Sequence, residues 1–317
     1  MLGPGRGPSN GRRYRRLHGA RWMSAKALPK SSVKRYLRPM TGVIILTGVE
    51  PRHEFVRKAI ALSEGLRVLR SYCEGEPGTA KVEIDNETPG ADRQEAHLAK
   101  RLRSERDFFG PFVRLVEDRS HPLLISVGAI NDQDVFDGIR ALEPDLVLAY
   151  GCSIVRDPLL GHFPGRFLNV HLGLSPYYRG SGTNFWALVN GEPEFVGATF
   201  MHMARQVDAG EIIHQIRARV YPGDTPHQIG NRLICDMAET YAELASRFDD
   251  VSQMPQLPPP QRQRHYRRKD FSPEAVTALY EQFSDGMIER YLGEAEARHS
   301  AAPIIVNDAL RRADEDR

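Results

Sequence analysis

The chain has 317 residues, enough for one large domain of about 200 residues with appendages, or for two modest domains. Its 41% hydrophobic and 26% charged residues are ordinary for a globular protein, and no apolar run approaches the ~18 residues of a membrane span. Residues 1–40 hold 11 of the 43 Lys and Arg residues and none of the 41 Asp and Glu residues, so the remainder carries about −9. A body this acidic argues against nucleic acid as a partner.

The three cysteines, Cys73, Cys152 and Cys235, lie far apart and show no metal-ligand spacing. Such a set is typical of reduced thiols rather than of a disulfide framework or a zinc site. The N-terminal arm also lacks the apolar segment of a secretory signal. We therefore expect a cytoplasmic protein without a metal ion.

Residues 1–40 are rich in Gly, Pro, Ser and Arg and have neither helical nor strand periodicity. This composition predicts a disordered basic extension. Met1, Met23 and Met40 are each a candidate start of the protein, and the sequence assigns the extension no chemistry.

From residue 41 onward, short apolar runs alternate with segments of helical periodicity. The runs typical of strands are 42–46, 66–71, 123–127, 145–150, 167–171, 195–203 and 211–220. The segments typical of helices are 51–65, 94–116, a short helix capped by Asn131, and a helix that begins at Thr225 with Gln228 completing a capping box. This alternation predicts an α/β fold with a doubly wound, largely parallel sheet covered on both faces.

Three domains or segments follow from this pattern: the extension 1–40, a catalytic domain 41–250, and a linker with a short, partly helical tail over 251–317. The tail includes a Pro/Gln-rich linker, a basic run at 262–269 and a helical segment at 273–292. It is too short to be a clear second catalytic domain.

Chemistry concentrates at Asn169-Val170-His171, which ends a predicted strand, and at Asp208 in a later loop. Side chains two apart on a strand share a face, so Asn169 and His171 project together while Val170 packs behind them. An amide donor can hold a developing oxyanion, and an imidazole can carry a proton. A nearby carboxylate can orient the imidazole and favour its protonated form.

The residues around this trio resemble those of the 10-formyltetrahydrofolate-dependent formyltransferase family. The elements that carry the resemblance are Asn-Val-His-Leu-Gly-Leu-Ser-Pro-Tyr-Tyr-Arg-Gly from residue 169, Trp-Ala at 186, Gly-Ala-Thr at 197 and Asp-Ala-Gly-Glu-Ile at 208. The family includes methionyl-tRNA, glycinamide ribonucleotide and nucleotide-sugar N-formyltransferases. The resemblance covers roughly 41–250 and implies a Rossmann-like formyltransferase domain.

The resemblance implies that Asn169, His171 and Asp208 are catalytic and that 10-formyltetrahydrofolate is the co-substrate. It also implies two folate-binding segments, Ser153-Ile154-Val155 and Arg205-Gln206-Val207. Core packing is a competing interpretation for Ile154 and Val155. The other histidines in this half are typical of strand, surface or capping positions: His162, His202, His214 and His227.

The loop after His171 departs from the commoner family text, because Gly173-Leu-Ser-Pro and Gly180-Ser-Gly-Thr-Asn replace more usual sequences. Stacking and charge there predict contacts with the acceptor. The candidate acceptor-binding residues are Ser175, Tyr177, Tyr178, Arg179, Thr183 and Asn184. A glycine hinge with ordinary exposed aromatic residues is the competing interpretation.

Two acceptors used by the family are disfavoured by features of the sequence. The loop Thr47-Gly-Val-Glu-Pro51 lacks the glycine-rich phosphate cradle of the glycinamide ribonucleotide enzymes, and the tail is shorter than the C-terminal domain of methionyl-tRNA formyltransferases. A nucleotide-linked amino sugar remains the preferred acceptor. A methionyl-tRNA formyltransferase-like enzyme and a catalytically silent folate-binding module stay open, as does a homodimer.

Overall fold

One seven-stranded sheet organises the chain, in the order β3-β2-β1-β4-β5-β7-β8. The computed structural model describes residue 3 and residues 40–75, 89–205 and 210–310. The strands of this sheet are β1 (Thr41–Gly48), β2 (Leu66–Glu74), β3 (Pro122–Ile125), β4 (Leu146–Tyr150), β5 (Phe167–His171), β7 (Gly197–His202) and β8 (Ile212–Arg217). The first five strands pair in parallel, whereas β7 and β8 are antiparallel to their neighbours.

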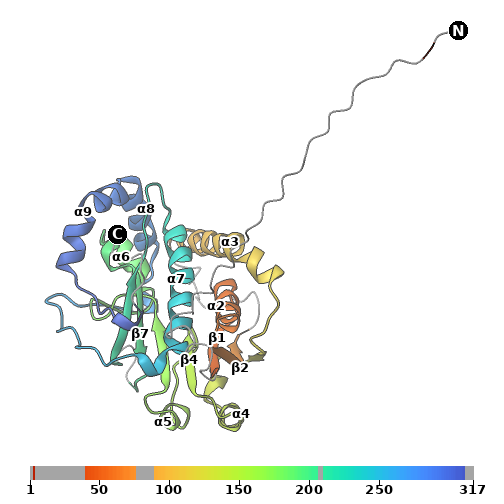
Figure 1. The fold of residues 1–317 in the computed structure, drawn as a ribbon. Helices are drawn as coiled ribbons and strands as arrows, with labels where there is room; N and C mark the ends of the chain where they lie inside the picture. The colour runs from red at the N-terminus through yellow and green to blue at the C-terminus, as the bar shows by residue number, and fades with distance from the viewer. Residues whose placement is uncertain (1–2, 4–39, 76–88, 206–209, 311–317) are drawn as a thin grey trace. The chain divides into compact units, whose positions relative to one another are not determined.

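Helices cover both faces of the sheet (Figure 1). They are α2 (Pro51–Ala61), α3 (Ala91–Leu115), α4 (Gln133–Ala141), α5 (Leu159–His162), α6 (Thr183–Val189), α7 (Pro226–Ser246), α8 (Pro273–Ser284) and α9 (Met287–Ala301). The single-turn helices are η1 (Ala129–Asn131), η2 (Pro193–Phe195), η3 (Phe248–Asp250), η4 (Arg268–Asp270) and η5 (Asp308–Leu310). A second, two-stranded parallel sheet joins β6 (Tyr178–Gly180) to β9 (Arg264–Tyr266).

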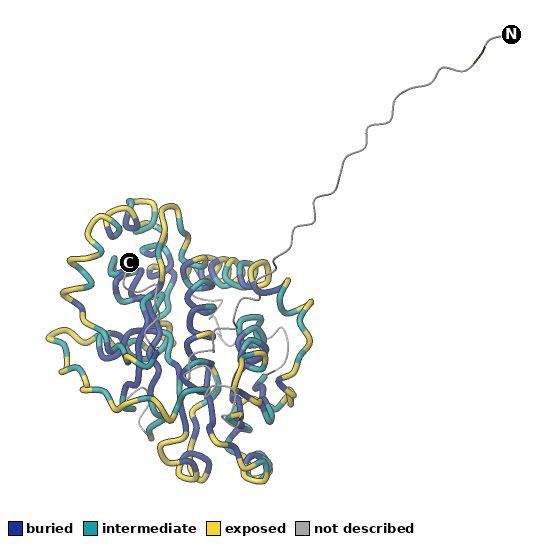
Figure 2. Tube along the Cα trace, viewed as in Figure 1, coloured by how far each residue is buried: buried dark blue, intermediate teal, exposed yellow. Residues whose placement is uncertain are grey.

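Side chains of β1 alternate between two hydrophobic cores because successive residues of a strand point to opposite faces. Val43 and Ile45 belong to the core beneath α2, α3 and α7, whereas Ile44 and Leu46 belong to the core beneath α4 and α5. The central strands are therefore buried, as Figure 2 shows. The prediction of a doubly wound, largely parallel sheet is confirmed.

Helix α7 begins where the sequence predicts it. Thr225 Oγ1 accepts a hydrogen bond from the Gln228 amide (3.3 Å), and Gln228 Oε1 accepts one from the Thr225 amide (2.9 Å), which completes the capping box. The predicted cap at Asn131 is wrong. Asp132 precedes α4, and the Asn131 amide instead holds the loop after β4, because its oxygen and nitrogen both meet backbone groups of that loop.

The segment after residue 250 packs against the sheet domain through two helices. The predicted single helix over 273–292 is divided at Gly286, whose φ of 73° suits glycine and ends α8 before α9 begins. Leu279 and Ile288 are buried, and the Tyr266 ring stacks on Trp186 at 4.1 Å between centroids. The predicted N-terminal extension lies outside the described residues except for Gly3 and Met40.

The Tyr241 hydroxyl links α7 to two strands just before they end. It accepts from the Ala149 amide (3.1 Å) in β4 and donates to the Leu168 carbonyl (2.9 Å) in β5. The side chain is 1% exposed, so water cannot replace the hydroxyl. This phenol therefore ties α7 to the backbone of both strands, which also pair with each other at Leu148–Leu168 and Ala149–Asn169.

We expect Tyr241→Phe to lower the free energy of unfolding by about 1–3 kcal/mol, because it removes two buried hydrogen bonds between α7 and the strands. Urea unfolding would measure this as a lower midpoint at an unchanged slope. Tyr221→Phe, at a position 47% exposed, is the matched control and should stay within about 0.5 kcal/mol of the wild type. Equal midpoints for the two variants would contradict the role assigned to Tyr241.

Candidate functional site

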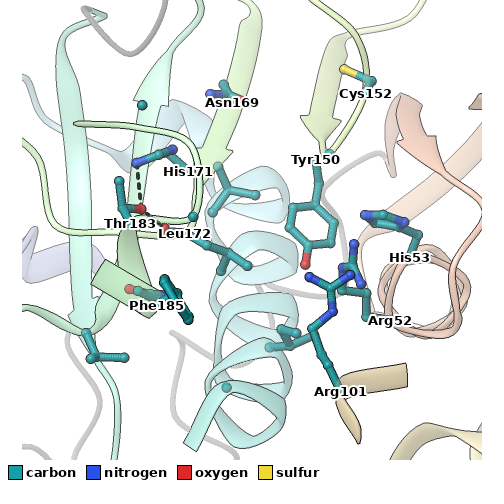
Figure 3. Close-up of a pocket in the computed structure, with 18 of the residues that line it drawn as sticks. Arg52, His53, Arg101, Tyr150, Cys152, Asn169, His171, Leu172, Thr183 and Phe185 are labelled. Carbon is teal, nitrogen blue, oxygen red and sulfur yellow. Dashed lines mark hydrogen bonds between the residues drawn. The ribbon is translucent and has the colours of Figure 1, made fainter. Parts of the chain in front are cut away.

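A cavity of about 470 Å³ opens at the carboxyl ends of β4 and β5. Its walls come from α2, α3 and α7 on one side and from the start of α6 on the other, with Leu279 of α8 also lining it. Ligands of open α/β sheets bind at this edge, near the point where the strand order reverses, here between β1 and β4. Figure 3 shows the side chains that face the cavity.

Asn169 and His171 both line the cavity, as their spacing on a strand predicts. Both are half-buried, whereas Val170 between them is 3% exposed and belongs to the core under α7. The strand β5 therefore presents an amide and an imidazole together at its carboxyl end (Figure 3).

Thr183, the first residue of α6, touches the His171 imidazole. Its Oγ1 lies 3.2 Å from His171 Nε2 and also makes a close contact with the Leu172 carbonyl oxygen. A carbonyl can only accept, so the single hydroxyl proton goes to Leu172. The contact with the imidazole is therefore a hydrogen bond when Nε2 carries a proton.

Gly173 makes room for this pair. A Cβ at residue 173 would lie 2.2 Å from Thr183 Oγ1 and 3.0 Å from His171 Nε2. The φ of 157° also lies in a region that favours glycine. Gly173 and Thr183 both lie where this sequence differs from the commoner family sequence. A side chain at residue 173 would collide with Thr183, so the threonine requires the glycine.

The loop after β4 brings Ser153, Ile154 and Val155 to the cavity. Ile154 is 57% exposed, whereas Val155 is 5% exposed and packs in the core under α4 and α5. Ile154 is therefore available to a ligand, whereas Val155 is a core residue at the cavity wall.

A buried carboxylate and a half-buried amide hold this loop. The Glu74 carboxylate, 0% exposed at the end of β2, accepts from the Ser153 amide (2.5 Å) and from the Gly128 amide (2.8 Å). Asn131 donates to the Ile154 carbonyl (3.0 Å) and accepts from the Arg156 amide (2.8 Å). The loop conformation is therefore fixed by side chains that the sequence places 20 to 80 residues away.

Only one residue of the second predicted folate segment is described. Arg205 lines the cavity and pairs with Asp157 at 2.7 Å, although its side chain is 82% exposed. Gln206, Val207 and the predicted catalytic Asp208 lie outside the described residues. Their roles stay predictions.

The predicted acceptor loop divides in a similar way. Thr183 and Asn184 line the cavity, but both Asn184 amide atoms are bonded to the backbone of Gly197 (3.0 and 3.1 Å). Ser175, Tyr177, Tyr178 and Arg179 do not line this cavity. Ser175 and Tyr178 are each 1% exposed.

Tyr177 and Tyr178 are used within the protein. The Tyr177 hydroxyl donates to the Pro303 carbonyl (2.7 Å), and the Tyr178 hydroxyl contacts Glu192 and accepts from Asn190 (3.0 Å). These two tyrosines therefore anchor the C-terminal segment and the end of α6, rather than facing the cavity.

Sequence reasoning missed a polar wall of the cavity opposite His171. It consists of Arg52, His53, His97, Arg101, Glu105, Tyr150 and His227. Three of these residues are spaced four apart on α3: His97, Arg101 and Glu105. This spacing places them on one face of the helix, and it is the pattern in the sequence that could have indicated the polar wall. Arg52 and His53 lie in the first turn of α2, just after the first strand. From the sequence, this position was considered only as a place for a glycine-rich phosphate loop.

Two imidazoles in this wall are neutral at neutral pH. Burial lowers the pKa of His97 to about 3, with smaller contributions from the charges of His227, Arg101 and Lys100. Burial, with Arg101 and Lys100, also lowers the pKa of His227 to about 4. Their ring centroids lie 5.0 Å apart. His227 is thus a cavity residue and not only a residue in the first turn of α7.

Two classes of site are not found among residues 40–75, 89–205 and 210–310. No group of three or more His, Cys, Asp or Glu side chains there could hold a metal ion. None of the helices described combines the length and apolar composition needed to cross a bilayer.

An open parallel sheet with an amide and an imidazole at one strand end is the frame of an acyl-transfer site. Residues 97–243 match the family model described as formyl transferase. Over 114 residues the chain is 36% identical to the methionyl-tRNA formyltransferase of Desulforamulus reducens, which covers 35% of this chain. The match spans about a third of that relative's length, also 35%.

Solved structures of similar proteins include two related enzymes. Glycinamide ribonucleotide transformylase 1 from Symbiobacterium toebii is 21% identical with a TM-score of 0.46, over 71% of this chain and 93% of that one. A sugar N-formyltransferase from Shewanella sp. FDAARGOS_354 is 18% identical with a TM-score of 0.47, over 73% of this chain and 78% of that one.

We expect Thr183→Val to release the His171 imidazole from a single tautomer, because valine keeps the shape of threonine but cannot accept from Nε2–H. The measurement is the ¹⁵N chemical shifts of the His171 ring in histidine-labelled protein near neutral pH. Thr183→Ser, which retains the hydroxyl, should keep the wild-type shifts. Wild-type shifts in the valine variant would show that Thr183 does not set the tautomer.

Proposed function

We propose that the protein transfers a formyl group from 10-formyltetrahydrofolate to a primary amine of a small acceptor, a nucleotide-linked amino sugar. The observation that carries the proposal is the placement of Asn169 and His171 together in one cavity with the loop Ser153–Val155. Amide donor, proton carrier and ligand-facing loop are the parts that this reaction requires.

In the proposed reaction, the neutral amine attacks the formyl carbon and a new C–N bond forms. The carbonyl oxygen becomes an oxyanion, which the Asn169 side-chain amide stabilises. The bond from carbon to folate N10 then breaks. His171 carries the proton from the attacking amine to N10, and Asp208 orients the imidazole.

The folate would lie against the loop after β4. Ile154 offers an exposed apolar side chain for a flat ring, and the loop backbone offers hydrogen-bonding groups for its edge. Arg205 stands at the other side of the same opening, next to the segment that carries Gln206 and Val207. Rigid support by Glu74 and Asn131 suits a loop that must recognise a planar ligand.

Methionyl-tRNA as acceptor is the second candidate, favoured by the sequence relative of that name. The basic run at 262–269 is the feature that would meet RNA. However, Arg264 in this run is 13% exposed and paired with Glu192, so its charge is used inside the protein. The other basic residues of the run, Arg262, Arg267, Arg268 and Lys269, are exposed, so the salt dependence of binding distinguishes the two acceptors.

A cytoplasmic location also fits the proposal, because the three cysteines are free thiols, as expected in a reducing compartment.

The first test combines purified protein, 10-formyltetrahydrofolate and a panel of amines: nucleotide-linked 4-amino sugars, glycinamide ribonucleotide and methionyl-tRNA. Absorbance follows the released tetrahydrofolate, and mass spectrometry follows the product. A gain of one formyl group on an amino sugar supports the proposal. Release of folate without a formylated product indicates a hydrolase, and saturable folate binding without turnover indicates a silent module.

We expect His171→Ala to lower kcat by about 10²–10⁴-fold, because the proton has no carrier. Folate affinity, measured by titration calorimetry, should stay near that of the wild type. His162→Ala, an exposed histidine of α5, is the matched control and should leave kcat unchanged. Full activity of the His171 variant would refute the proposed chemistry.

We expect Glu74→Gln to weaken folate binding by about tenfold, because one carboxylate oxygen that accepts from a backbone amide becomes an NH₂ donor facing that amide. Titration calorimetry below the unfolding midpoint measures the Kd. Glu64→Gln, at an exposed position, is the control. If Glu74→Gln lowers the stability of the protein while its folate Kd is unchanged, Glu74 supports the fold alone.

A further inference from the structure

A buried row of residues crosses three strands of the sheet and begins at His171. Thr199 of β7 lies directly opposite His171 of β5, and Gln215 of β8 lies directly opposite Thr199. Residues that face one another across antiparallel strands carry their side chains on the same face of the sheet. Thr199 and Gln215 are 0% and 1% exposed, so the row leads from the site into the protein. The mechanism proposed above uses neither of them.

Gln215 and Thr199 hold the loop that follows His171. The side-chain nitrogen of Gln215 donates to the Ser175 carbonyl (2.7 Å) and to the Thr199 hydroxyl (2.9 Å). That hydroxyl donates in turn to the Gly173 carbonyl (2.6 Å) and accepts from the Ser175 amide (3.1 Å). Two side chains therefore bind three backbone groups of the loop, and each of their polar hydrogens is used.

This loop packs directly against the imidazole. The Gly173 backbone lies so close to the contact between His171 and Thr183 that a Cβ at residue 173 would collide with both side chains. The carbonyl of Leu172, one residue earlier, contacts the Thr183 hydroxyl. A displacement of the loop therefore displaces the groups that surround the imidazole. An error of about 1 Å in the position of a catalytic group can cost about 10²-fold in rate.

The other end of the row reaches the C-terminal segment 302–310. The Ile305 amide donates to Gln215 Oε1 (3.0 Å), and the Gln215 amide donates to the Ile305 carbonyl (2.7 Å). A backbone amide can only donate and the Ser175 carbonyl can only accept, so these two partners fix the orientation of the Gln215 side chain between them. One side-chain amide thus joins the C-terminal segment to the loop after His171.

The C-terminal segment is anchored independently of Gln215. The Tyr177 hydroxyl donates to the Pro303 carbonyl (2.7 Å). The Asn307 amide donates to His214 Nδ1 (3.0 Å), and the Asn307 side chain donates to the Ser252 carbonyl (2.9 Å). Asn307 is 0% exposed. The segment therefore offers Gln215 a fixed partner.

We propose that Gln215 is a positioning residue for the formyl-transfer site, because it couples the C-terminal segment to the loop that seats the His171 ring. The position of the imidazole then depends on a segment outside residues 97–243, which match the family model. Gln215 itself does not line the cavity, so its loss should lower kcat rather than raise a KM. The role of Gln215 rests on the proposed function for the reaction that it serves.

The first test measures the ¹⁵N chemical shifts of the His171 ring in histidine-labelled full-length protein, without folate or turnover. Gln215→Met keeps the length of the side chain but removes its hydrogen bonds, and we expect it to shift or broaden these signals. Val68→Ala is the control, because it removes buried methyl groups from β2, which four strands separate from β8. Unchanged signals in Gln215→Met, or the same change in Val68→Ala, overturn the positioning role.

A second variant tests the coupling with Gln215 in place and decides the question if Gln215→Met does not fold. Ile305→Pro removes the amide hydrogen that Gln215 Oε1 accepts. We expect the His171 ring signals to change in this variant as well. His171 signals like those of the wild type would show that the C-terminal segment does not position the imidazole.

The third test separates positioning from binding, at a temperature at which all variants are folded. With an acceptor that the protein formylates, Gln215→Met should lower kcat about tenfold or more and leave both KM values within about twofold. Val68→Ala should keep the wild-type kcat. A raised KM at an unchanged kcat would overturn the positioning role. His171 signals that depend on Gln215 in a protein that transfers no formyl group would refute the proposed function and leave the positioning of the ring standing.

Discussion

The parallel direction of β1, β4 and β5 is the constraint on which the site depends. Because parallel strands end at one edge, the residues that follow or finish each strand meet there: Arg52 after β1, Tyr150 at the end of β4, and Asn169 with His171 at the end of β5. The Tyr241 hydroxyl, bonded to Ala149 and Leu168, also ties the last two of these strands to α7, whose first turns line the cavity.

Two of the groups at this edge are held in place by other side chains of the protein. Thr183 holds the His171 ring, and Glu74 with Asn131 holds the loop at Ser153–Val155. Fixed donors need no reorganisation while charge develops, and this is where an acyl-transfer site gains most. The supporting residues explain why polar side chains such as Glu74 are buried without a charged partner from the described residues: they bind backbone amides of the loops that form the site.

Periodicity and local chemistry were sufficient to predict the sheet, the capping box at Thr225 and the shared face of Asn169 and His171. These features depend on residues within a few positions of one another. The polar wall could not be predicted in the same way, because Arg52 and Glu105 meet across 53 residues and Ser153 meets Glu74 across 79. Tyr178 illustrates the opposite error: an aromatic residue in a plausible binding loop is buried because β9, almost 90 residues later, pairs with it. Side-chain exposure in a loop is a tertiary property.

The C-terminal segment completes the cavity wall beside α6. Strand β9 pairs with β6, and Tyr266 stacks on Trp186 of α6, the helix whose first residue contacts His171. A Cβ at Gly180 would lie 2.0 Å from the Tyr266 carbonyl oxygen, so the two segments approach as closely as a glycine allows. Leu279 of α8 reaches the cavity itself. Changes in this segment, which lies outside the residues matched by the family model, can therefore alter both the shape of the cavity and the position of the imidazole.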